Sequence, residues 1–335
     1  MTSVPSTVYV GTMEDAYALT GVDGDPAVRS LGLRASGGVR ALLVDRLDPA
    51  RLYAGTAARG VLRTTDQGLT WDEANRGLVH QDVFCLTQHS GTAVLYAGTE
   101  PANVFRSADG GDTWVGSPAL RALPETRDWS FPRPPHIAHV RDIAVRDDDP
   151  RDVCCAIEDG WLVRSRDGGE TWTQVRDGVD CDAHTVTFMP DDPSVVYAAT
   201  GNFGYRSTDG GATFARACTG LDRGYMAGIV VHPARPRVLL TVAARHSPPS
   251  WRTERGGDAA VYRSEDQGLT WSRVTQGLPD YVAAGCWSVA GDPHDPDTAL
   301  FGLFDGTVWA TTDGARSFRL LARLEGAVRA IVFAR

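Results

Sequence analysis

The sequence predicts an all-β protein, a seven-bladed β-propeller of four-stranded antiparallel blades. The first observation is an eight-residue pattern, Ser/Thr-x-Asp-x-Gly-x-Thr-Trp/Phe, that occurs six times. The second is its spacing, because successive aspartates lie 43, 58, 42, 57 and 47 residues apart, a period typical of propellers. The third is that strand-like runs precede each copy, and one more such run ends the chain. The aspartates are Asp66, Asp109, Asp167, Asp209, Asp266 and Asp313.

Each letter of the pattern has a local physical reason, seen most fully in Ser165–Trp172. The aspartate can accept hydrogen bonds from backbone amides of a tight turn, and glycine supplies the positive φ that the turn requires. The aromatic residue closes the motif and is expected to wedge between neighbouring sheets. The last copy, Thr311–Phe318, is weaker, because Ala315 and Ser317 replace glycine and threonine. We therefore expect these aspartates to be structural.

The pattern resembles the Asp-box, or bacterial neuraminidase repeat, of β-propellers. The resemblance extends over nearly the whole chain. It implies the propeller fold, while Asp-boxes occur alike in sialidases, other glycosidases, sortilin-type receptors and photosystem II assembly factors. The resemblance therefore leaves the function open.

The strand-like runs fall into a repeating four-strand unit with the Asp-box as its third turn. Residues 7–33 supply the second, third and fourth strands of a unit but no first strand. Residues 327–333 resemble a first strand with nothing after it. We expect the two ends to share one blade, which closes the ring and removes exposed sheet edges. Residues 1–335 then form a single seven-bladed domain.

Two insertions, residues 116–139 and 245–258, interrupt the repeat with loops rich in proline, aromatic residues and histidine. In an antiparallel unit, alternate turns share one face. The Asp-boxes therefore lie on one face, and both insertions project from the other. Long loops on a rigid scaffold often carry function, so we expect the site opposite the Asp-boxes.

Composition narrows the possible partners. The net charge is −9, and all 33 basic residues are arginines. An acidic surface disfavours nucleic acid and anionic membranes, so we expect neither as a partner. The six cysteines have no disulfide or metal spacing, and Met1–Pro5 does not resemble a secretion signal. These features predict a cytoplasmic protein.

The predicted catalytic residues are Glu158, Asp182, His184 and Tyr225, from adjoining units at the insertion face. Asp182 and His184 are two residues apart, which places them on one side of an extended segment. Glu158, Asp182 and His184 suit either general acid–base chemistry or a divalent metal. The alternative is that polar side chains line the mouth only because the channel holds water.

A second set is predicted to contact a small-molecule ligand around the same mouth. Arg40, Arg141 and Arg329 each lie near the start of a first strand, and the resemblance to sialidases implies that they could mimic the three arginines with which those enzymes bind a substrate carboxylate. Trp129 and Trp251 could provide a ring platform, or could pack the insertions down. The predicted substrate-binding residues are Glu14, Arg40, Glu100, Trp129, His139, Arg141 and Trp251.

Two functions remain open. One is an intracellular hydrolase or lyase of small molecules or glycosides, with the cofactor unknown or a divalent metal. The other is a non-catalytic propeller that binds a protein partner and resembles the photosystem II assembly factors. A sialidase is expected less, because the early Phe/Tyr-Arg-Ile-Pro signature is absent and the resemblance to sialidases implies six blades.

Overall fold

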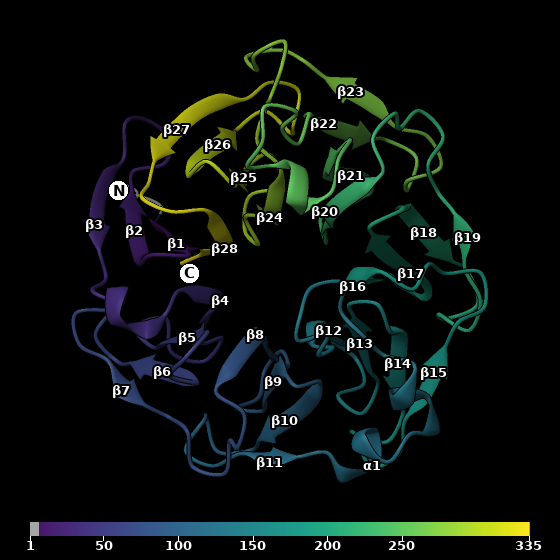
Figure 1. Cartoon of the computed structure of the whole chain (residues 1–335). Helices are drawn as coiled ribbons and strands as arrows, with labels where there is room; N and C mark the ends of the chain where they lie inside the picture. The colour runs from purple at the N-terminus through teal and green to yellow at the C-terminus, as the bar shows by residue number, and fades with distance from the viewer. Residues whose placement is uncertain (1–6, 335) are drawn as a thin grey trace.

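The computed structural model describes residues 7–334, and its strands form seven four-stranded antiparallel sheets around a central channel. Figure 1 shows the ring along its axis, with β4, β8, β12, β16, β20, β24 and β28 innermost. The predicted all-β, seven-bladed architecture is confirmed. Residues 1–6 and 335 lie outside the described part, including Met1–Pro5, on which the prediction about secretion rests.

Each blade is a meander that runs from the channel outwards, and the blades are numbered here in chain order. Blade 1 contains β4 (Val39–Val44), β5 (Leu52–Thr56), β6 (Val61–Thr64) and β7 (Asp72–Glu73). Blade 2 contains β8 (Asp82–Gln88), β9 (Leu95–Glu100), β10 (Asn103–Ser107) and β11 (Val115–Gly116). Blade 3 contains β12 (Val140–Val145), β13 (Val153–Ile157), β14 (Trp161–Ser165) and β15 (Thr173–Val175). Blade 4 contains β16 (Ala183–Met189), β17 (Asp192–Thr200), β18 (Phe203–Ser207) and β19 (Ala215–Arg216). Blade 5 contains β20 (Tyr225–His232), β21 (Arg235–Ala244), β22 (Ala259–Ser264) and β23 (Ser272–Val274). Blade 6 contains β24 (Cys286–Gly291), β25 (Ala299–Leu303), β26 (Thr307–Thr311) and β27 (Arg319–Arg323).

Blade 7 joins the two ends of the described chain. Its inner strand is β28 (Val328–Phe333), which pairs antiparallel with β1 (Thr7–Thr12). β2 (Ala16–Thr20) and β3 (Ala27–Ser30) complete the sheet. In Figure 1 the yellow β28 lies beside the purple β1. The pairing buries apolar side chains of both ends, such as Val10 and Ile331, and closes the ring as predicted.

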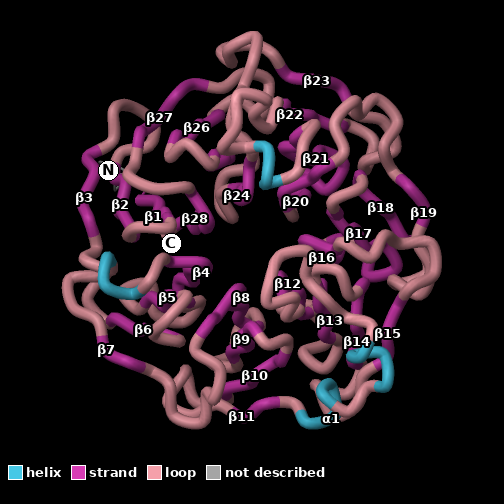
Figure 2. Tube along the Cα trace, viewed as in Figure 1, coloured by secondary structure: helices cyan, strands magenta, loops and turns pink. Residues whose placement is uncertain are grey.

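The helical segments are few and short, as Figure 2 shows. In the first insertion, where only loop was predicted, α1 (Pro118–Arg121) and the 3₁₀ turn η2 (Pro124–Arg127) form. Proline begins both, and Ser117 caps α1 by accepting a hydrogen bond from the backbone N–H of Leu120. The other 3₁₀ turns are η1 (Arg34–Ser36) and η3 (Pro248–Ser250). Within residues 7–334, no helix is long and apolar enough to cross a membrane.

The Asp-box aspartates bind their own turns. Asp167 Oδ1 accepts hydrogen bonds from Ser165 Oγ at 2.8 Å and from the backbone N–H of Thr171 at 2.9 Å. Its Oδ2 accepts from Thr171 Oγ1 at 2.6 Å. The motif's Trp172 then donates from Nε1 to Ser117 Oγ of the preceding blade at 2.9 Å. Each box thus stabilises a turn and pins one blade to its neighbour.

These bonds predict a loss of stability in acid. The hydrogen bonds from Thr171 and Thr113 lower the pKa of Asp167 and of Asp109 to about 2, whereas an aspartate in the unfolded chain titrates near about 3.9. A lowered pKa contributes stability above the unfolded value, and this contribution is lost as the pH falls towards the folded value. We expect the melting temperature to drop mainly between about pH 4 and about pH 2, and to drop less steeply in Asp167→Ala. Asp147→Ala, on the same face outside the boxes, is the control; an equal slope in all three proteins would contradict this role.

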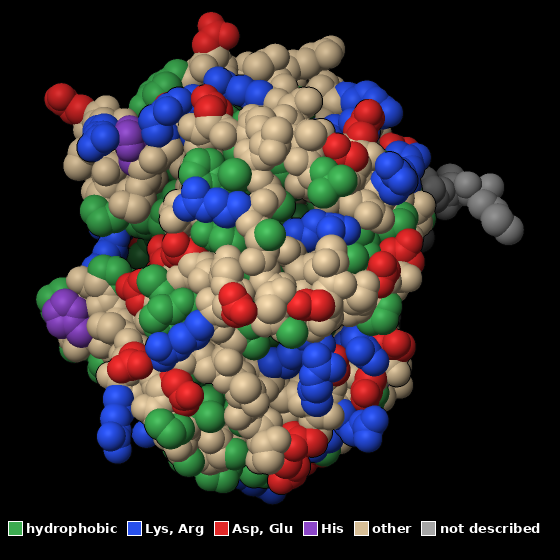
Figure 3. Space-filling model, turned by 90° about the vertical axis from the view of Figure 1, so that its right-hand side faces the viewer, with side chains coloured by type: hydrophobic (Ala, Val, Ile, Leu, Met, Phe, Trp, Pro, Cys, Tyr) green, Lys and Arg blue, Asp and Glu red, His purple; other side chains and the backbone are tan. Residues whose placement is uncertain are grey.

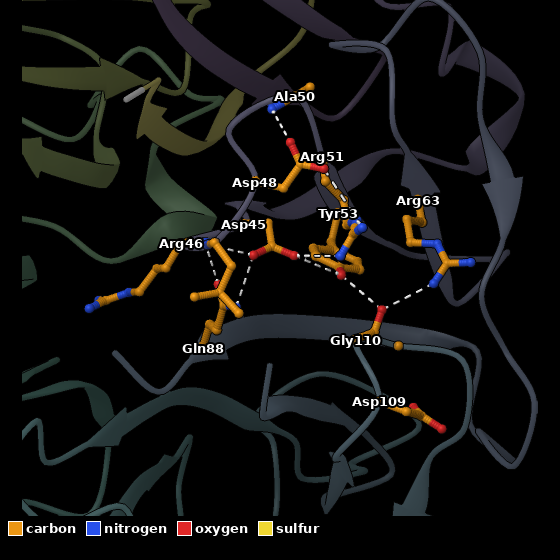
Figure 4. A network of polar contacts seen from close by, with 12 residues as sticks. Asp45, Arg46, Asp48, Ala50, Arg51, Tyr53, Arg63, Gln88, Asp109 and Gly110 are labelled. Carbon is orange, nitrogen blue, oxygen red and sulfur yellow. Dashed lines mark hydrogen bonds and ion pairs between the residues drawn. The ribbon is translucent and has the colours of Figure 1, made fainter. Parts of the chain in front are cut away.

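A second type of contact ties blades 1 and 2 together on the Asp-box face (Figure 4). Tyr53 donates its hydroxyl to the carbonyl of Gly110 in the Asp-box of blade 2 at 2.8 Å. Asp45 Oδ1 accepts from Gln88 Nε2 at 3.1 Å, and its Oδ2 accepts from Arg51 Nη1 at 3.1 Å. Burial, reinforced by the charge of Asp45, raises the pKa of Tyr53 to about 12. The tyrosine therefore remains a neutral donor, and the bond to Gly110 persists across the neutral range.

Candidate functional site

Every inner strand has a β-bulge at its channel end. In β4, for example, Val39 pairs with Thr56 and Ala41 with Gly55, so Arg40 has no opposite residue in the neighbouring strand β5. A bulge bends its strand and redirects a side chain. Six strands leave one residue unpaired in this way, and β20 leaves two, Ala227 and Gly228. The bulges bring together a ring of channel residues, one from each blade: Arg40, Phe84, Arg141, His184, Ala227, Trp287 and Arg329.

A cavity of about 670 Å³ lies at this ring, bounded by both insertions. The first insertion contributes Phe131–Pro135 and the second contributes Ser247–Pro249 and Arg252. In the side view of Figure 3, two protrusions that each carry a histidine stand on one edge with a hollow between them. Seven of the predicted site residues line the cavity: Arg40, Glu100, His139, Arg141, Glu158, Asp182 and Tyr225.

Glu158 is the most strongly held anion in the cavity. It follows β13, and its Oε2 accepts hydrogen bonds from His139 Nε2 at 2.9 Å and from Arg141 Nη1. The His139 ring stacks on Phe84 with ring centroids 3.7 Å apart, and its Nδ1 lies 3.3 Å from a carboxylate oxygen of Glu100. Burial alone would raise the pKa of Glu158, but Arg141 and His139 outweigh it and hold the pKa well below its usual range. Glu158 is therefore ionised at neutral pH, which rules it out as the proton donor there.

Asp182 and His184 lie within hydrogen-bond distance of each other. His184 Nδ1 contacts the carbonyl oxygen of Met226 at 2.7 Å, and only a protonated nitrogen can donate to a carbonyl. His184 Nε2 contacts Asp182 Oδ1 at 3.2 Å. Nε2 is thus the ring nitrogen that faces the Asp182 carboxylate. His184 has no exposed side-chain surface, whereas Asp182 is 29% exposed. Asp182 is thus the member of the pair that can reach a ligand.

The predicted metal ligands also come together. Glu158, Asp182 and His184 each offer one ligand atom, and these atoms lie within 4.8 Å of one another. Imidazole and carboxylate donors suit zinc and similar ions, and a backbone carbonyl on the second histidine nitrogen is a common support for a metal ligand. The bond of Arg141 to Glu158 opposes this use, because it places a cation beside the same carboxylate. The set fits a divalent ion only if Glu158 coordinates through the oxygen that Arg141 does not hold.

Tyr225 and Asp159 complete the acid–base surroundings. The ring of Tyr225 lies 4.5 Å from that of His184, and burial raises the pKa of its hydroxyl, so Tyr225 is a neutral hydrogen-bond donor. Asp159, next to Glu158, is half-buried. Burial and the nearby Asp182 and Glu158 carboxylates raise the pKa of Asp159 to about 6. A carboxyl with a pKa of about 6 therefore lies next to Glu158 in the chain.

Three predicted binding residues do not line the cavity. Trp129 packs in the apolar core of blades 2 and 3. Trp251 is buried behind the wall, where its Nε1 donates to the carbonyl of His246 at 2.7 Å and its ring contacts Trp287 at 5.1 Å. Glu14 is exposed beside Gly326. Both tryptophans therefore pack the insertions down, which was the alternative to a ring platform for a ligand.

The cavity-lining residues that sequence reasoning missed include Phe84, Arg133, Arg252 and Phe304. A signal existed for Phe84. In β4, β8, β12, β16, β24 and β28 the bulged residue directly follows an almost fully buried residue, Val, Ala or Cys. Aligning these six strands on that residue places Phe84 at the same position as Arg40 and Arg141. No pattern in the chain marks the other three, since they lie in irregular loops and turns.

Comparison with known proteins places the fold. No protein-family model matches the sequence, and no curated protein matches it. Among solved structures, a GH74 xyloglucanase from Xanthomonas campestris superposes with a TM-score of 0.69 at 18% identity, covering 99% of this chain and 53% of that one. An ancestral GH74 enzyme gives 0.65 at 20% identity, covering 88% and 38%. YCF48 bound to D1 peptide gives 0.55 at 16% identity, covering 84% and 81%.

These likenesses concern architecture. The chain spans about half or less of the length of the GH74 structures, but most of the length of YCF48. At such identities a shared fold does not carry a shared activity. The protein is a seven-bladed β-propeller of the Asp-box type, structurally similar to GH74 enzymes and to YCF48.

Proposed function

We propose that the protein is a hydrolase or lyase of a small, anionic, glycoside-type molecule, and that it acts through Glu158 and Asp182. The observation that carries the proposal is that these two carboxylates share one cavity with ligand atoms no more than 4.8 Å apart, yet differ in environment. In many active sites two carboxyl groups in different environments take the separate roles of general acid and of base or nucleophile. A spacing near about 5 Å suits attack by one carboxylate and protonation by the other.

In this mechanism Glu158 is the ionised partner. Arg141 and His139 both bind its Oε2, which leaves Oε1 free of these two cations and able to act as nucleophile or base. The mechanism requires Asp182 to carry a proton beside His184 Nε2, which it delivers to the leaving oxygen as the bond from that oxygen to the substrate carbon breaks. Tyr225 remains protonated and can donate to the substrate. If a divalent ion bound at Glu158, Asp182 and His184, it would supply Lewis acidity in place of the proton on Asp182.

The relatives of similar structure support two classes of function. Several are GH74 enzymes, one of them described as a xyloglucanase, which favours glycoside chemistry. The second candidate is recognition of a protein segment, because YCF48 has been solved with D1 peptide and matches this chain over most of its length. The arginine-lined cavity between two loops favours a peptide with a terminal or side-chain carboxylate.

The test is a turnover screen with chromogenic glycosides, neutral and uronic, run with chelator and with added Zn²⁺, Mn²⁺ or Mg²⁺. Losing a general acid typically costs about 10²–10⁴-fold in rate, so we expect Asp182→Asn to lower kcat by about 10³-fold on any substrate found. Asp147→Asn, in a solvated run on the opposite face, should turn over like the wild type. Turnover by Asp182→Asn at the wild-type rate would reject the mechanism. Absence of turnover, with binding of carboxyl-terminal peptides in the cavity, would favour the second candidate.

A further inference from the structure

We propose that the cavity is built for a small organic dianion, with one anionic group deep in the channel at Arg329 and a second at the rim between Arg133 and Arg252. The inference rests on the same cavity as the proposed function but requires binding only. Arg133, Arg252 and Arg329 line this cavity without a carboxylate partner in the described part of the chain. Two aromatic rings hold Arg329 and Arg252 apart.

The deep position contains three guanidinium groups, of which two are neutralised by the protein. Arg40 forms an ion pair with Asp82 at 2.6 Å, and Arg141 forms one with Glu158. Arg329, from the ring-closing strand β28, has no such partner among residues 7–334 and lies against Trp287, with its Cζ 3.9 Å from the ring centroid. Burial, together with Arg141 and Arg40, lowers the pKa of Arg329 to about 9. Its cationic form therefore lacks a compensating anion, which a ligand would supply.

The rim position is supplied by the two insertions. Arg133 comes from the first insertion and Arg252 from the second; both line the cavity, and both are exposed. Neither forms an ion pair with any carboxylate in the described part of the chain. They come from the two insertions that bound the cavity, and the proposal places the second anionic group between them. Guanidinium groups suit carboxylate or phosphate in this role, since they present paired N–H donors.

An aromatic ladder separates the two positions. Arg329 stacks on Trp287, the Trp287 ring lies 5.1 Å from that of Phe304, and Arg252 lies over Phe304 at 5.0 Å. Two rings therefore stand between the deep and the rim cations. A ligand that reaches both must carry its anionic groups on opposite sides of an intervening body, and an aromatic or sugar ring that packs on Trp287 and Phe304 has that form.

The test uses ligands that share one ring and differ in charge: glucose, glucuronate, glucose 1-phosphate and glucuronic acid 1-phosphate, each titrated by calorimetry at low salt. A hydrogen-bonded ion pair is worth about tenfold or more in affinity. We expect no binding of glucose, weak binding of the two single anions, and binding of the dianion about tenfold tighter or more. Raising the salt concentration should weaken every one of these interactions.

Variants assign the two positions. Arg329→Gln should weaken the dianion and both single anions, whereas Arg133→Gln combined with Arg252→Gln should reduce the dianion to the affinity of a single anion. Arg323→Gln, an exposed arginine on the outer strand β27, is the matched control and should bind like the wild type. All variants are first compared with the wild type by thermal melting, and a destabilised Arg329→Gln is replaced by Arg329→Lys, which keeps the charge but loses the paired donors.

Two results would overturn the inference: equal affinity for the dianion and the single anions, or unchanged dianion affinity in the rim double variant. The inference and the proposed function also fail separately. Dianion binding without turnover of any substrate leaves this site in place and rejects the chemistry of Glu158 and Asp182. Turnover of neutral glycosides without dianion binding supports the chemistry of Glu158 and Asp182 and rejects the dianion site.

Discussion

Asp152→Ala is expected to lower the free energy of unfolding by about 3–5 kcal/mol, the usual result of removing one partner of a buried ion pair. Asp152 Oδ1 accepts from Arg164 Nε at 2.7 Å, and its Oδ2 accepts from Arg164 Nη2 at 2.6 Å. The Asp152 and Arg164 side chains are 3% and 5% exposed, and Arg146 adds a third contact to the aspartate at 3.2 Å. Without the carboxylate, the Arg164 guanidinium stays buried with no counter-charge. Chemical denaturation would measure the loss.

The matched control is the double variant Asp152→Ala/Arg164→Met, which removes both charges and keeps most of the side-chain volume. Replacing a buried pair by apolar groups is often neutral, so this variant should recover most of the lost stability. Arg164→Met alone should be destabilising, because Asp152 would then keep only its contact with Arg146. A loss below about 1 kcal/mol in Asp152→Ala, the value for an exposed pair, would contradict this assignment.

Gly201→Ala is expected to disable the proposed chemistry without removing a functional group. A Cβ on Gly201 would lie 1.9 Å from Asp182 Oδ2, so the carboxylate must move. The backbone of residue 201 is not in the left-handed region, so alanine itself is tolerated there. A displacement of about 1 Å at a reacting group can cost about 10²-fold in rate. We therefore expect about that loss in kcat on the substrate found by the screen.

A spectroscopic measurement separates this effect from a general disturbance. The ring nitrogen signals of His184 report its contact with Asp182, and they should shift in Gly201→Ala even when no substrate is present. Gly24→Ala is the control, because a Cβ there would meet nothing within 4 Å and its φ is ordinary. Unchanged His184 signals in Gly201→Ala would show that Asp182 accommodates the methyl group, and the predicted loss of rate would then have no basis.

Most of the fold could be predicted from the chain because its signals are local and repeated. The six Asp-boxes each depend on hydrogen bonds within five residues, as between Asp167 and Thr171, so they are readable without knowing the neighbours. The missing first strand of residues 7–33 and the unpaired run at 327–333 predicted the closure now seen between β1 and β28. The helix α1 was missed, because four residues between prolines carry no periodic pattern.

The site was predictable only in part. Strand alternation placed Glu158, Asp182, His184 and Tyr225 at one mouth, and they do meet there. It could not show that Arg141 and His139 would both bind Glu158, since these contacts join residues 17 and 19 positions apart across a bulged strand end. Nor could it separate Trp251, which packs behind the wall, from Phe304 and Trp287, which line it.

Turn chemistry and strand alternation act over a few residues, so the number of blades, their closure and the face that carries the insertions could be predicted from the chain. Which side chains face the channel depends on how the blades pack together. Where the seven inner strand ends converge on one axis, a bulge shifts one residue of six strands, and two residues of β20, out of the alternation. That convergence gathers Arg40, Arg141 and Arg329, from blades far apart in the chain, around one cavity.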